Sequence, residues 1–325
     1  MRVAIVGATG MVGRELLQVL EERNFPVTEL SLFASEKSAG EFLHFRETPW
    51  RVEALSQRLN GHSELVFLTA GSEISRKYAQ IFVMEGAIVI DNSSAWRLDP
   101  HVPLIVPEVN LEHISHSRLI ANPNCSTIQL VVVLAPLHQA FGLRRVVVCT
   151  YQAVTGSGYK GVNQLLGERE NKNYRKYYPH PIDLNVIPQC DHFEANGYTV
   201  EEMKIIRETR KILNLPNLNI TATCVRVPVL GGHSEAVNIE FEDSFTLAQV
   251  YKVLRAAPGL VITDENKPEA YPIPLKVRGK NEVYVGRIRK DDSVNNGINL
   301  WIVADNLRKG AATNAVQIAE KVLFS

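Results

Sequence analysis

The stretch RVAIVGATGMVG, residues 2–13, decides the fold that we expect for this chain. It begins with a short apolar run of the kind that forms buried parallel strands. Glycines follow at Gly7, Gly10 and Gly13, and residues 14–22 continue with helical periodicity. A strand, a glycine-rich turn and a helix in this order are the context that a dinucleotide-binding fingerprint requires.

In such a fingerprint each of the three positions requires glycine for a physical reason. Gly7 permits the tight turn, Gly10 lets a pyrophosphate approach the backbone near the helix N-terminus, and Gly13 lets helix and strand pack closely. The spacing is G-x-x-G-x-x-G rather than G-x-G-x-x-G, so a plain glycine turn is the alternative. The position at the start of a strand–helix unit favours the dinucleotide.

Strands and helices continue to alternate, which predicts a doubly wound parallel sheet. Further strands are expected at residues 29–34, 65–69 and 87–91, with a helix near residues 73–84. An NAD-selective site usually places Asp or Glu at the end of the second strand, to bond the ribose 2′-hydroxyl.

The turn after the second strand favours NADP. Ser35, Lys37 and Ser38 can donate hydrogen bonds to a 2′-phosphate. Glu36 lies among them and would suit a 2′-hydroxyl instead. The remaining alternative is a solvated polar turn that binds no cofactor.

The composition limits the class of protein. At 325 residues the chain exceeds one compact core, so two domains are expected. Lysine plus arginine equals aspartate plus glutamate, 35 each, which argues against nucleic-acid and polybasic membrane proteins. The four cysteines form no C-x-x-C pair, and Cys190, His192 and His180 are irregularly spaced, so we expect neither a metal site nor a disulfide scaffold. We find no secretory signal and no membrane-spanning apolar run, and a reducing cytoplasm fits.

The segment NPNCST, residues 122–127, offers a candidate nucleophile. Asn124 is a favoured N-cap residue, and the apolar run at residues 128–137 predicts a helix after it. Cys125 then lies in the first helical turn, where backbone N–H groups and the helix dipole favour the nucleophilic thiolate. The alternative is a buried structural cysteine, since cysteine is often a core residue.

Each of several other polar residues has two interpretations, a functional role and a purely structural one. Gln152 ends a strand and can orient a carbonyl or an imidazole, or be an ordinary strand-end amide. His233 follows two glycines and can act as acid or base, or be a satisfied loop or core histidine. Arg97 can hold a phosphate or carboxylate bidentately, or form a surface ion pair. Glu201 and Lys204 share a helix face, as solvated pairs commonly do.

In combination and in order, the motifs resemble those of aspartate-semialdehyde dehydrogenases over essentially the whole chain. The supporting segments are GATGMVG (7–13), FASEKSAG (33–40), DNSSAWR (91–97), VPEVN (106–110), NPNCST (122–127), YQAVTGSG (151–158), NVIP (185–188), EEMK (201–204), RVPVLGGHSE (226–235) and DNLRKGAATNAVQ (305–317).

The resemblance implies a homodimer whose chain has two domains. Residues 1–125 and 306–325 would form a Rossmann-type dinucleotide-binding domain, to which the helix expected at residues 306–323 belongs, and residues 126–305 an α+β catalytic and dimerisation domain. It implies reduction of L-aspartyl-4-phosphate by NADPH to L-aspartate 4-semialdehyde and phosphate, a step in lysine, diaminopimelate, threonine and methionine synthesis.

The resemblance also assigns roles position by position. Cys125 would be the nucleophile that forms a thioester, His233 the acid/base that protonates the oxyanion formed by hydride transfer, and Gln152 the residue that assists at the reacting carbonyl. The expected substrate contacts are Arg226 to the carboxylate, Glu201 to the amino group, and Arg97, Asn124 and Lys204 to the phosphate. The expected cofactor contacts are Gly7, Thr9, Gly10, Met11, Val12, Gly13, Ser35, Lys37, Ser38, Thr155, Gly156 and Asn306.

Two departures and two alternatives accompany the resemblance. Lys37 stands where many members have arginine, which weakens a bidentate grip on a 2′-phosphate, and Thr155 replaces a common serine. A related acyl-phosphate reductase of the N-acetyl-glutamyl-phosphate type is one alternative, but an acetylated amine needs no partner such as Glu201. A non-catalytic cofactor-binding paralogue is the other, and the presence of Cys125 and His233 argues against it.

Overall fold

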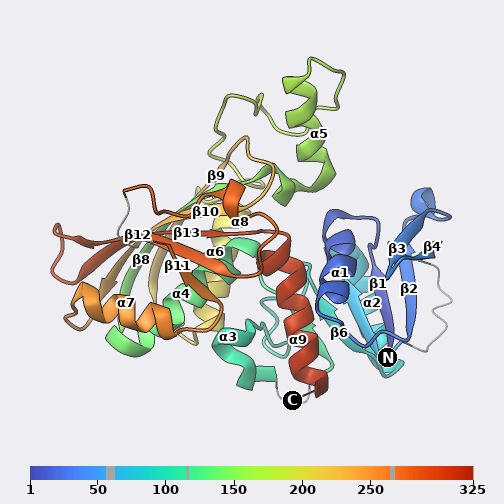
Figure 1. Ribbon diagram of the computed structural model, residues 1–325, viewed down its shortest axis with the longest axis horizontal. Coiled ribbons are helices and arrows are strands. Elements are labelled where there is room, and N and C mark those ends of the chain that lie inside the picture. Colours follow the sequence, from blue (N-terminus) through green and yellow to red (C-terminus); the bar gives the residue numbers. More distant parts are fainter. Residues whose placement is uncertain (56–62, 115–116, 264–267, 325) are drawn as a thin grey trace. The chain divides into compact units, whose positions relative to one another are not determined.

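The computed structural model describes residues 1–55, 63–114, 117–263 and 268–324. Contacts divide the chain into two compact units (Figure 1), which we call the first unit, Met1–Asn124 with Ala311–Ser325, and the second unit, Cys125–Gly310. The domain limits expected from the sequence stay a prediction.

The first unit holds a seven-stranded sheet in the order β3-β4-β2-β1-β5-β6-β7. All pairs are parallel except β3 with β4. The strands are β1 (Arg2–Val6), β2 (Glu29–Ala34), β3 (Phe42–Phe45), β4 (Thr48–Ala54), β5 (Leu65–Leu68), β6 (Ile88–Asp91) and β7 (Leu119–Ala121). The helices are α1 (Met11–Glu22), η1 (Glu36–Ser38), α2 (Ser72–Met84), α3 (Pro107–Asn110), η2 (Leu111–Ile114) and α9 (Thr313–Phe324).

The strand order of the first unit confirms the expected doubly wound sheet. From β1 the chain crosses by α1 to β2 on one side, whereas β5 on the other side continues by α2 to β6. Right-handed crossovers in opposite directions place α1 and α2 on opposite faces. The switch point lies between β1 and β5, and open α/β sheets bind ligands at such a point.

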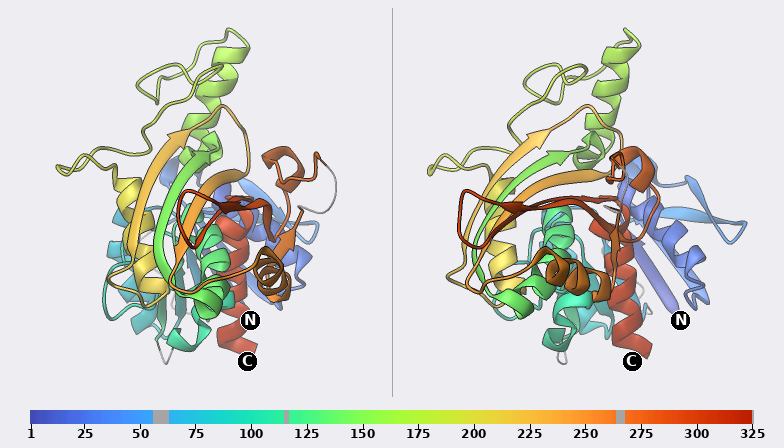
Figure 2. Two further views of the ribbon diagram at one scale, coloured as in Figure 1. Left: turned by 90° about the vertical axis from the view of Figure 1, so that its left-hand side faces the viewer. Right: turned by 60° about the vertical axis from the view of Figure 1, so that its left-hand side comes forward.

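The second unit holds a six-stranded mixed sheet in the order β11-β12-β13-β10-β8-β9. The strands are β8 (Leu143–Gln152), β9 (Asn219–Arg226), β10 (His233–Phe241), β11 (Leu260–Ile262), β12 (Val283–Asp291) and β13 (Gly297–Ala304). The helices are α4 (Cys125–Phe141), η3 (Val154–Ser157), α5 (Gly158–Arg169), α6 (Val200–Ile212), α7 (Leu247–Ala256) and α8 (Pro274–Val277). The π-helical η4 (Arg308–Ala312) begins in the second unit, and its last two residues, Ala311 and Ala312, belong to the first. Helices α4, α6 and α7 cover one face of this sheet (Figure 2).

Helix α4 is the centre of the second unit. Its residues from Ser126 to Ala135 are all buried, as expected for a helix that is apolar on nearly every side. It packs on β8, β10 and β13 and against α6 and α7. The helix begins at Cys125, so the cysteine is fixed at the start of an element that is buried along most of its length.

Strand register brings three predicted site residues together at one end of the sheet. Gln152 is paired with Arg226 across the parallel β8–β9 ladder. In the antiparallel β8–β10 ladder Ser234 pairs with Tyr151, which places His233 next to Gln152. Three residues far apart in sequence therefore become neighbours, because β8 and β9 end, and β10 begins, at the same end of the sheet.

An arm formed by α5 and the following loop extends from the second unit (Figure 1). Side chains on α5 hold the loop: Gln164 Oε1 accepts from the Tyr177 and Tyr178 N–H groups, and Glu168 Oε2 accepts from those of Ile182 and Asp183. The loop passes back to the sheet, where it supplies residues to a pocket.

Two expected boundaries were wrong. The helix expected from Asn306 instead begins with the π-helical turn η4, and regular helix α9 starts only at Thr313. Helix α1 begins at Met11, earlier than the periodicity indicated, because Gly10 takes the extended N-cap conformation.

Candidate active site

The glycine turn of the first unit is built as the fingerprint requires. Gly7 has φ +89°, and a Cβ there would lie 2.6 Å from Thr69 Oγ1 and 2.9 Å from the Ala70 nitrogen. A Cβ on Gly13 would lie 2.4 Å from the Gly7 carbonyl oxygen. Any side chain at either position would therefore push β1, α1 and the end of β5 apart.

Helix α1 directs its first N–H groups at this turn. Gly10 is the N-cap, and Thr9 precedes it in the turn, with its carbonyl accepting from Arg14 Nε at 3.2 Å. Met11 and Val12 form the first helical turn with Gly13. Because Gly10 has no side chain to cap them, these N–H groups are suited to bind an anion.

The predicted ribose turn follows β2 directly. Ser35 is the N-cap of η1, which contains Glu36, Lys37 and Ser38. Ser35, Glu36 and Lys37 are exposed, and Ser38 is half-buried. The cation and both hydroxyls thus lie on the carboxyl end of the second strand, as expected.

Arg97 is buried near the carboxyl end of β6. Its Nε donates to the Asn122 carbonyl at 3.0 Å and its Nη2 to the Asn92 carbonyl at 2.8 Å. These two bonds anchor the guanidinium to the segment that precedes Asn124, the last residue before α4. The surface ion pair that the sequence left open does not describe this arginine, which is 8% exposed.

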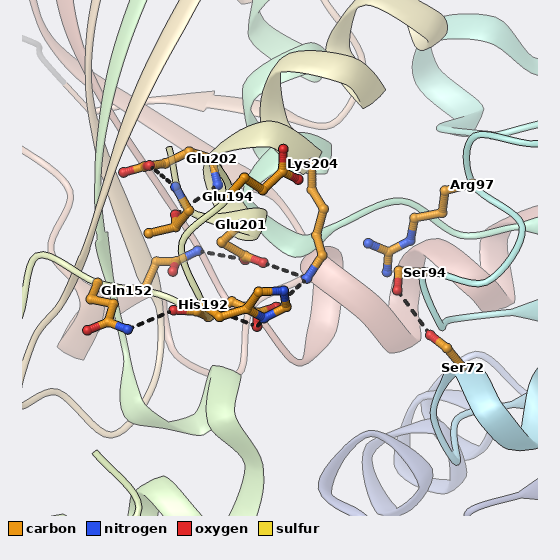
Figure 3. Close-up of polar contacts among 12 residues, drawn as sticks. Ser72, Ser94, Arg97, Gln152, His192, Glu194, Glu201, Glu202 and Lys204 are labelled. Carbon is orange, nitrogen blue, oxygen red and sulfur yellow. Dashed lines mark hydrogen bonds and ion pairs between the residues drawn. The ribbon is translucent and has the colours of Figure 1, made fainter. Parts of the chain in front are cut away.

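Gln152 joins two of the expected catalytic segments in the second unit. Its Nε2 donates to Ser126 Oγ at 2.8 Å. The same nitrogen donates to Glu201 Oε1 at 3.2 Å (Figure 3). Ser126 follows Cys125 in the first turn of α4. The side chain is fully buried, and in the described part of the chain its Oε1 has no hydrogen-bond partner. The amide is therefore held by its nitrogen while its oxygen stays available.

Glu201 and Lys204 are fixed by the start of α6. Thr199 and Glu202 form a capping box, and Glu202 also accepts from the Cys224 N–H at 2.8 Å, which ties the helix to β9. Lys204 Nζ then lies 3.1 Å from both Glu201 Oε2 and Asp191 Oδ2 (Figure 3). Burial opposes the charge of Lys204, but the two carboxylates outweigh it and raise the pKa of the ammonium.

Arg226 is buried with its guanidinium turned to the same end of the sheet. Its Nη1 donates to the Ala153 carbonyl at 2.7 Å, and its Nε lacks a partner among the described residues. Burial lowers the pKa of such a group, but the surrounding Cys190, Tyr178, Glu201 and Cys125 more than compensate and raise it. The side chain is a permanent buried cation with a donor to spare.

His233 lies fully buried at the start of β10. Its Nδ1 accepts a hydrogen bond from the Ala153 N–H at 3.1 Å. Its Nε2 has no partner in the part of the chain that the structure describes. Burial and then Arg226 lower the pKa of the ring to about 3.

The remaining predicted residues of the second unit also converge. Asn306 Oδ1 accepts from Thr155 Oγ1 and from the Gly232 N–H, both at 3.1 Å. A Cβ on Gly156 would lie 2.8 Å from Arg226 Nη1 and 3.1 Å from His233 Nε2. At Gly310 a Cβ would lie 2.9 Å from the Cβ of Cys125.

A pocket of about 410 Å³ opens beside these groups within the second unit. It is lined by Gly156, Ser157, Tyr177, Tyr178, Pro179, Gln189, Cys190, Asp191, His192, Glu201, Lys204 and Arg226.

Sequence reasoning found Gly156, Glu201, Lys204 and Arg226 but missed most of the other lining residues. Asp191 has φ +72°, an unusual conformation for a residue other than glycine and often a sign of function. No sequence signal marks Tyr178, whose hydroxyl donates to Ser157 Oγ at 3.0 Å.

Comparisons with known proteins agree with this geometry. Residues 2–117 match the family model of the semialdehyde dehydrogenase NAD binding domain, and residues 134–309 that of the semialdehyde dehydrogenase dimerisation domain. The aspartate-semialdehyde dehydrogenase of Aquifex aeolicus is 49% identical over 98% of this chain and 97% of its own.

Solved structures show the same likeness. The crystal structure of aspartate semialdehyde dehydrogenase II from Vibrio cholerae, complexed with ASA, has a TM-score of 0.95 at 44% identity, covering 99% of this chain and 98% of that one. That of the Candida albicans enzyme with NADP has a TM-score of 0.77 at 25% identity, covering 99% and 98%. Both the sequence likeness and the fold likeness extend over nearly the whole chain, which therefore belongs to the aspartate-semialdehyde dehydrogenase family.

Proposed function

We propose that the protein catalyses the NADPH-dependent reductive dephosphorylation of L-aspartyl-4-phosphate to L-aspartate 4-semialdehyde and phosphate. One observation carries the proposal. Three buried polar atoms at one end of the sheet in the second unit have no hydrogen-bond partners among the described residues: Gln152 Oε1, Arg226 Nε and His233 Nε2. Buried polar groups are rarely left unpaired, so a polar ligand is expected there.

The charges in the second unit match the two ends of an amino acid. Arg226 suits the α-carboxylate, since a guanidinium can hold a carboxylate through two donors. Glu201 suits the α-ammonium, which an N-acetylated substrate lacks. Lys204 lies beside Glu201 and suits the phosphate, to which we also assign Arg97 and Asn124 of the first unit. This set favours aspartyl phosphate over an N-acetyl-glutamyl phosphate.

The proposed chemistry starts at Cys125. The thiolate attacks the acyl carbon, phosphate leaves with the electron pair of the C–O bond, and a thioester with Cys125 remains. Gln152, held by Ser126 and Glu201, orients the acyl group. We assign to His233, the predicted acid/base, the oxygen of the reacting carbonyl, where negative charge develops.

The residues of the first unit fit a dinucleotide cofactor. At Gly10 a Cβ would meet the Gly7 carbonyl oxygen at 3.2 Å and no other described atom within 4 Å, so the start of α1 leaves room for a pyrophosphate. Bound NADPH supplies a hydride to the thioester. The residues that would hold it are those of the predicted set: Gly7, Thr9, Gly10, Met11, Val12, Gly13, Ser35, Lys37 and Ser38 in the first unit, and Thr155, Gly156 and Asn306 in the second.

We further propose a homodimer that works in the cytoplasm, in the synthesis of lysine, diaminopimelate, threonine and methionine. The second unit matches a dimerisation domain. Its sheet carries Tyr151, which is 36% exposed and packs on Trp301 at 5.4 Å between ring centroids. Exposed aromatic side chains are common at protein interfaces. No helix in the described ranges is long and apolar enough to cross a membrane.

The test is phosphate-dependent NADP⁺ reduction by purified protein with aspartate semialdehyde, beside N-acetyl-glutamate semialdehyde. We expect turnover with the first aldehyde and little with the second. Cys125→Ser should abolish turnover but keep NADP binding by calorimetry. Wild-type protein that binds NADP but turns over neither aldehyde would support the non-catalytic alternative.

A further inference from the structure

The second unit buries a carboxylic acid that the proposed reaction does not use. Glu235 lies on β10 and is fully buried. Register places it between Thr150 of β8 and Ile302 of β13, both of which are also fully buried. Because side chains two positions apart on a strand point to the same face, Glu235 shares the face of His233, which α4 covers. It therefore lies in the row of side chains directly behind the predicted site residues.

The position of Glu235 is unusual because the next row on this face is apolar. That row consists of Ala222, Val148, Val237 and Leu300, which pair across β9, β8, β10 and β13 and are all buried. An apolar side chain at position 235 would extend this core without the cost of removing a carboxyl group from water. Residues that break a local rule in this way are expected near functional sites, where a property other than stability is needed.

Gln129 of α4 is a polar neighbour of this carboxyl group. Its side chain is close enough to act on the ionisation of Glu235 through hydrogen bonding. Its Nε2 donates to the His233 carbonyl at 3.5 Å, a long hydrogen bond, so its Oε1 is the other end of the amide. Within the ranges that the structure describes, Gln129 Oε1 and both carboxyl oxygens of Glu235 have no hydrogen-bond partner. Three acceptor oxygens on two neighbouring side chains thus lack a donor.

One proton on Glu235 satisfies this pair of side chains. A protonated carboxyl group has an O–H to donate, and Gln129 Oε1 can accept it. An ionised carboxylate has only acceptors, so it would turn negative oxygens towards the amide oxygen in a buried place. Burial raises the pKa of Glu235 well above its usual range, and Gln129 opposes that rise less strongly.

The ionisable groups on the surrounding elements do not stabilise a carboxylate at this position. On this face β8 and β13 present no ionisable side chain, and those of α4 are Cys125 at its start and His138 in its last turn. Cys224 of β9 keeps its thiol proton, because burial raises its pKa well above the usual range. His233 stays neutral, because burial and then Arg226 lower its pKa to about 3. Arg226 acts on that histidine but not on the ionisation of the buried acid.

We propose that Glu235 is a positioning residue: a neutral carboxylic acid whose O–H holds the Gln129 amide, and with it the first turns of α4, against the start of β10. Gln129 follows Cys125 by four residues, so both lie on the same side of the helix. The link therefore connects the turn that carries the proposed nucleophile to the end of the sheet that carries the other site residues. Its expected effect on rate rests on the proposed function, whereas the protonated state of Glu235 does not.

A double-mutant cycle on kcat tests the link. Glu235→Met and Gln129→Met keep the length of each side chain but remove its polar group. A displacement of 1 Å near a reacting group can cost about 10²-fold, and a shift of about half that size should lower kcat roughly tenfold in each variant. The double variant should lose no more than about threefold beyond either single variant, since the same link is broken in all three. KM for aspartate semialdehyde should stay within about twofold, because neither side chain lines the pocket.

Thermal melting of the same variants separates positioning from a purely structural role. Replacing both polar partners by apolar groups of similar shape is nearly neutral or stabilising. The double variant should therefore melt within about 3 °C of wild type or above it, although its kcat is lower. A melting temperature that falls in step with kcat would show a structural role only. Losses of kcat that multiply to about a hundredfold would show that the two side chains act independently. Either result, or a Glu235→Met variant with the kcat of wild type, overturns the proposal.

Glu235→Gln tests the proton on the acid. The new amide nitrogen can donate to Gln129 Oε1 without taking up a proton, so kcat should stay within about threefold of wild type. A loss of kcat as large as that of Glu235→Met would contradict the donor role. Glu240→Gln is the matched control, because Glu240 lies on the opposite face of β10, where it pairs with Arg144 at 3.2 Å.

The pH dependence of melting reports the protonated state without any turnover. In the folded protein the pKa of Glu235 lies well above its ordinary value of 4.5. Its contribution to stability is therefore complete below about pH 4.5 and is lost as the pH rises towards the folded pKa. Glu235→Gln should gain roughly 2–4 °C on wild type for each pH unit above about pH 5 until that pKa is reached.

The full-length proteins would be compared at one concentration, since melting of an oligomer depends on it. Glu240→Gln should show no such trend. A difference between Glu235→Gln and wild type that stays constant with pH would mean that Glu235 ionises as easily in the folded as in the unfolded chain, and would overturn the proposal. If wild-type protein were inactive, the proposed function would fail while this measurement still stood.

Discussion

Gly156→Ala tests a close approach between two predicted site residues of the second unit. The new Cβ would meet Arg226 Nη1 at 2.8 Å and His233 Nε2 at 3.1 Å. Ordinary contacts are near 3.6 Å, so one or both groups must move by roughly 0.5–1 Å. Arg226 cannot move freely, because its Nη1 donates to the Ala153 carbonyl at 2.7 Å.

A displacement of about 1 Å in a reacting constellation can cost about 10²-fold in rate. We therefore expect kcat/KM for aspartate semialdehyde to fall by roughly two orders of magnitude, which corresponds to about 2.7 kcal/mol of transition-state stabilisation. The φ of Gly156 lies outside the left-handed region, so the backbone accepts alanine, and crowding should cost about 1–3 kcal/mol of folding free energy.

The assay is steady-state kinetics in the phosphorylating direction, with thermal melting to confirm that the variant is folded at the assay temperature. Gly231→Ala is the matched control, since the three atoms nearest to its Cβ would belong to the flexible Arg278 side chain, at 3.2 Å or more. Gly156→Ala with kcat/KM within twofold of wild type, or an equal loss in the control, would refute the reasoning.

Three further variants probe the substrate and cofactor contacts. Arg226→Lys should mainly raise KM for aspartate semialdehyde, because a point charge does not reproduce a bidentate fork; an effect confined to kcat would remove Arg226 from carboxylate binding. Asp191→Asn keeps a hydrogen-bond acceptor for Lys204 but removes a negative charge near the proposed phosphate, so KM for phosphate should fall, by no more than about fivefold for a pair this exposed. Glu194→Gln is its control, because it breaks an ion pair with Arg207, which lies on α6 as Lys204 does. A raised KM for phosphate in Asp191→Asn would show that the carboxylate is needed to place Lys204. Lys37→Ala should raise KM for NADP while leaving KM for NAD within about twofold; equal effects on both cofactors would mean that Lys37 does not contact the 2′-phosphate.

Local rules predicted those parts of the molecule whose cause is local. The bounds of β2 follow from an apolar pattern, and the start of α4 at Cys125 follows from Asn124, a residue type that is favoured at the N-cap. The glycine turn was predictable because Gly7 and Gly13 each pack closely against backbone atoms. Three glycines at a fixed spacing indicate such close packing in the sequence.

The rest depends on tertiary contacts that one sequence does not display. Asp191 becomes relevant only because the arm returns to the sheet and brings its carboxylate to Lys204. The hairpin of β3 and β4 is short, and β4 is ordered by pairing with β2. The π-helical η4 replaces a regular helix where Gly310 passes the Cβ of Cys125, a contact between residues far apart in the chain.

The first unit is discontinuous, and this affects how the protein folds on the ribosome. Helix α9 belongs to that unit, where Arg23 after α1 forms an ion pair with Glu320, 297 positions later. At a synthesis rate of about 5–20 residues per second, roughly 15–60 s separate the emergence of these two partners. Throughout that interval α9 is not yet available to cover its side of α1, although the first unit is the one whose synthesis begins first. The second unit, which is continuous in sequence, can complete its core earlier. The first unit, although its synthesis begins first, is therefore the last to be completed.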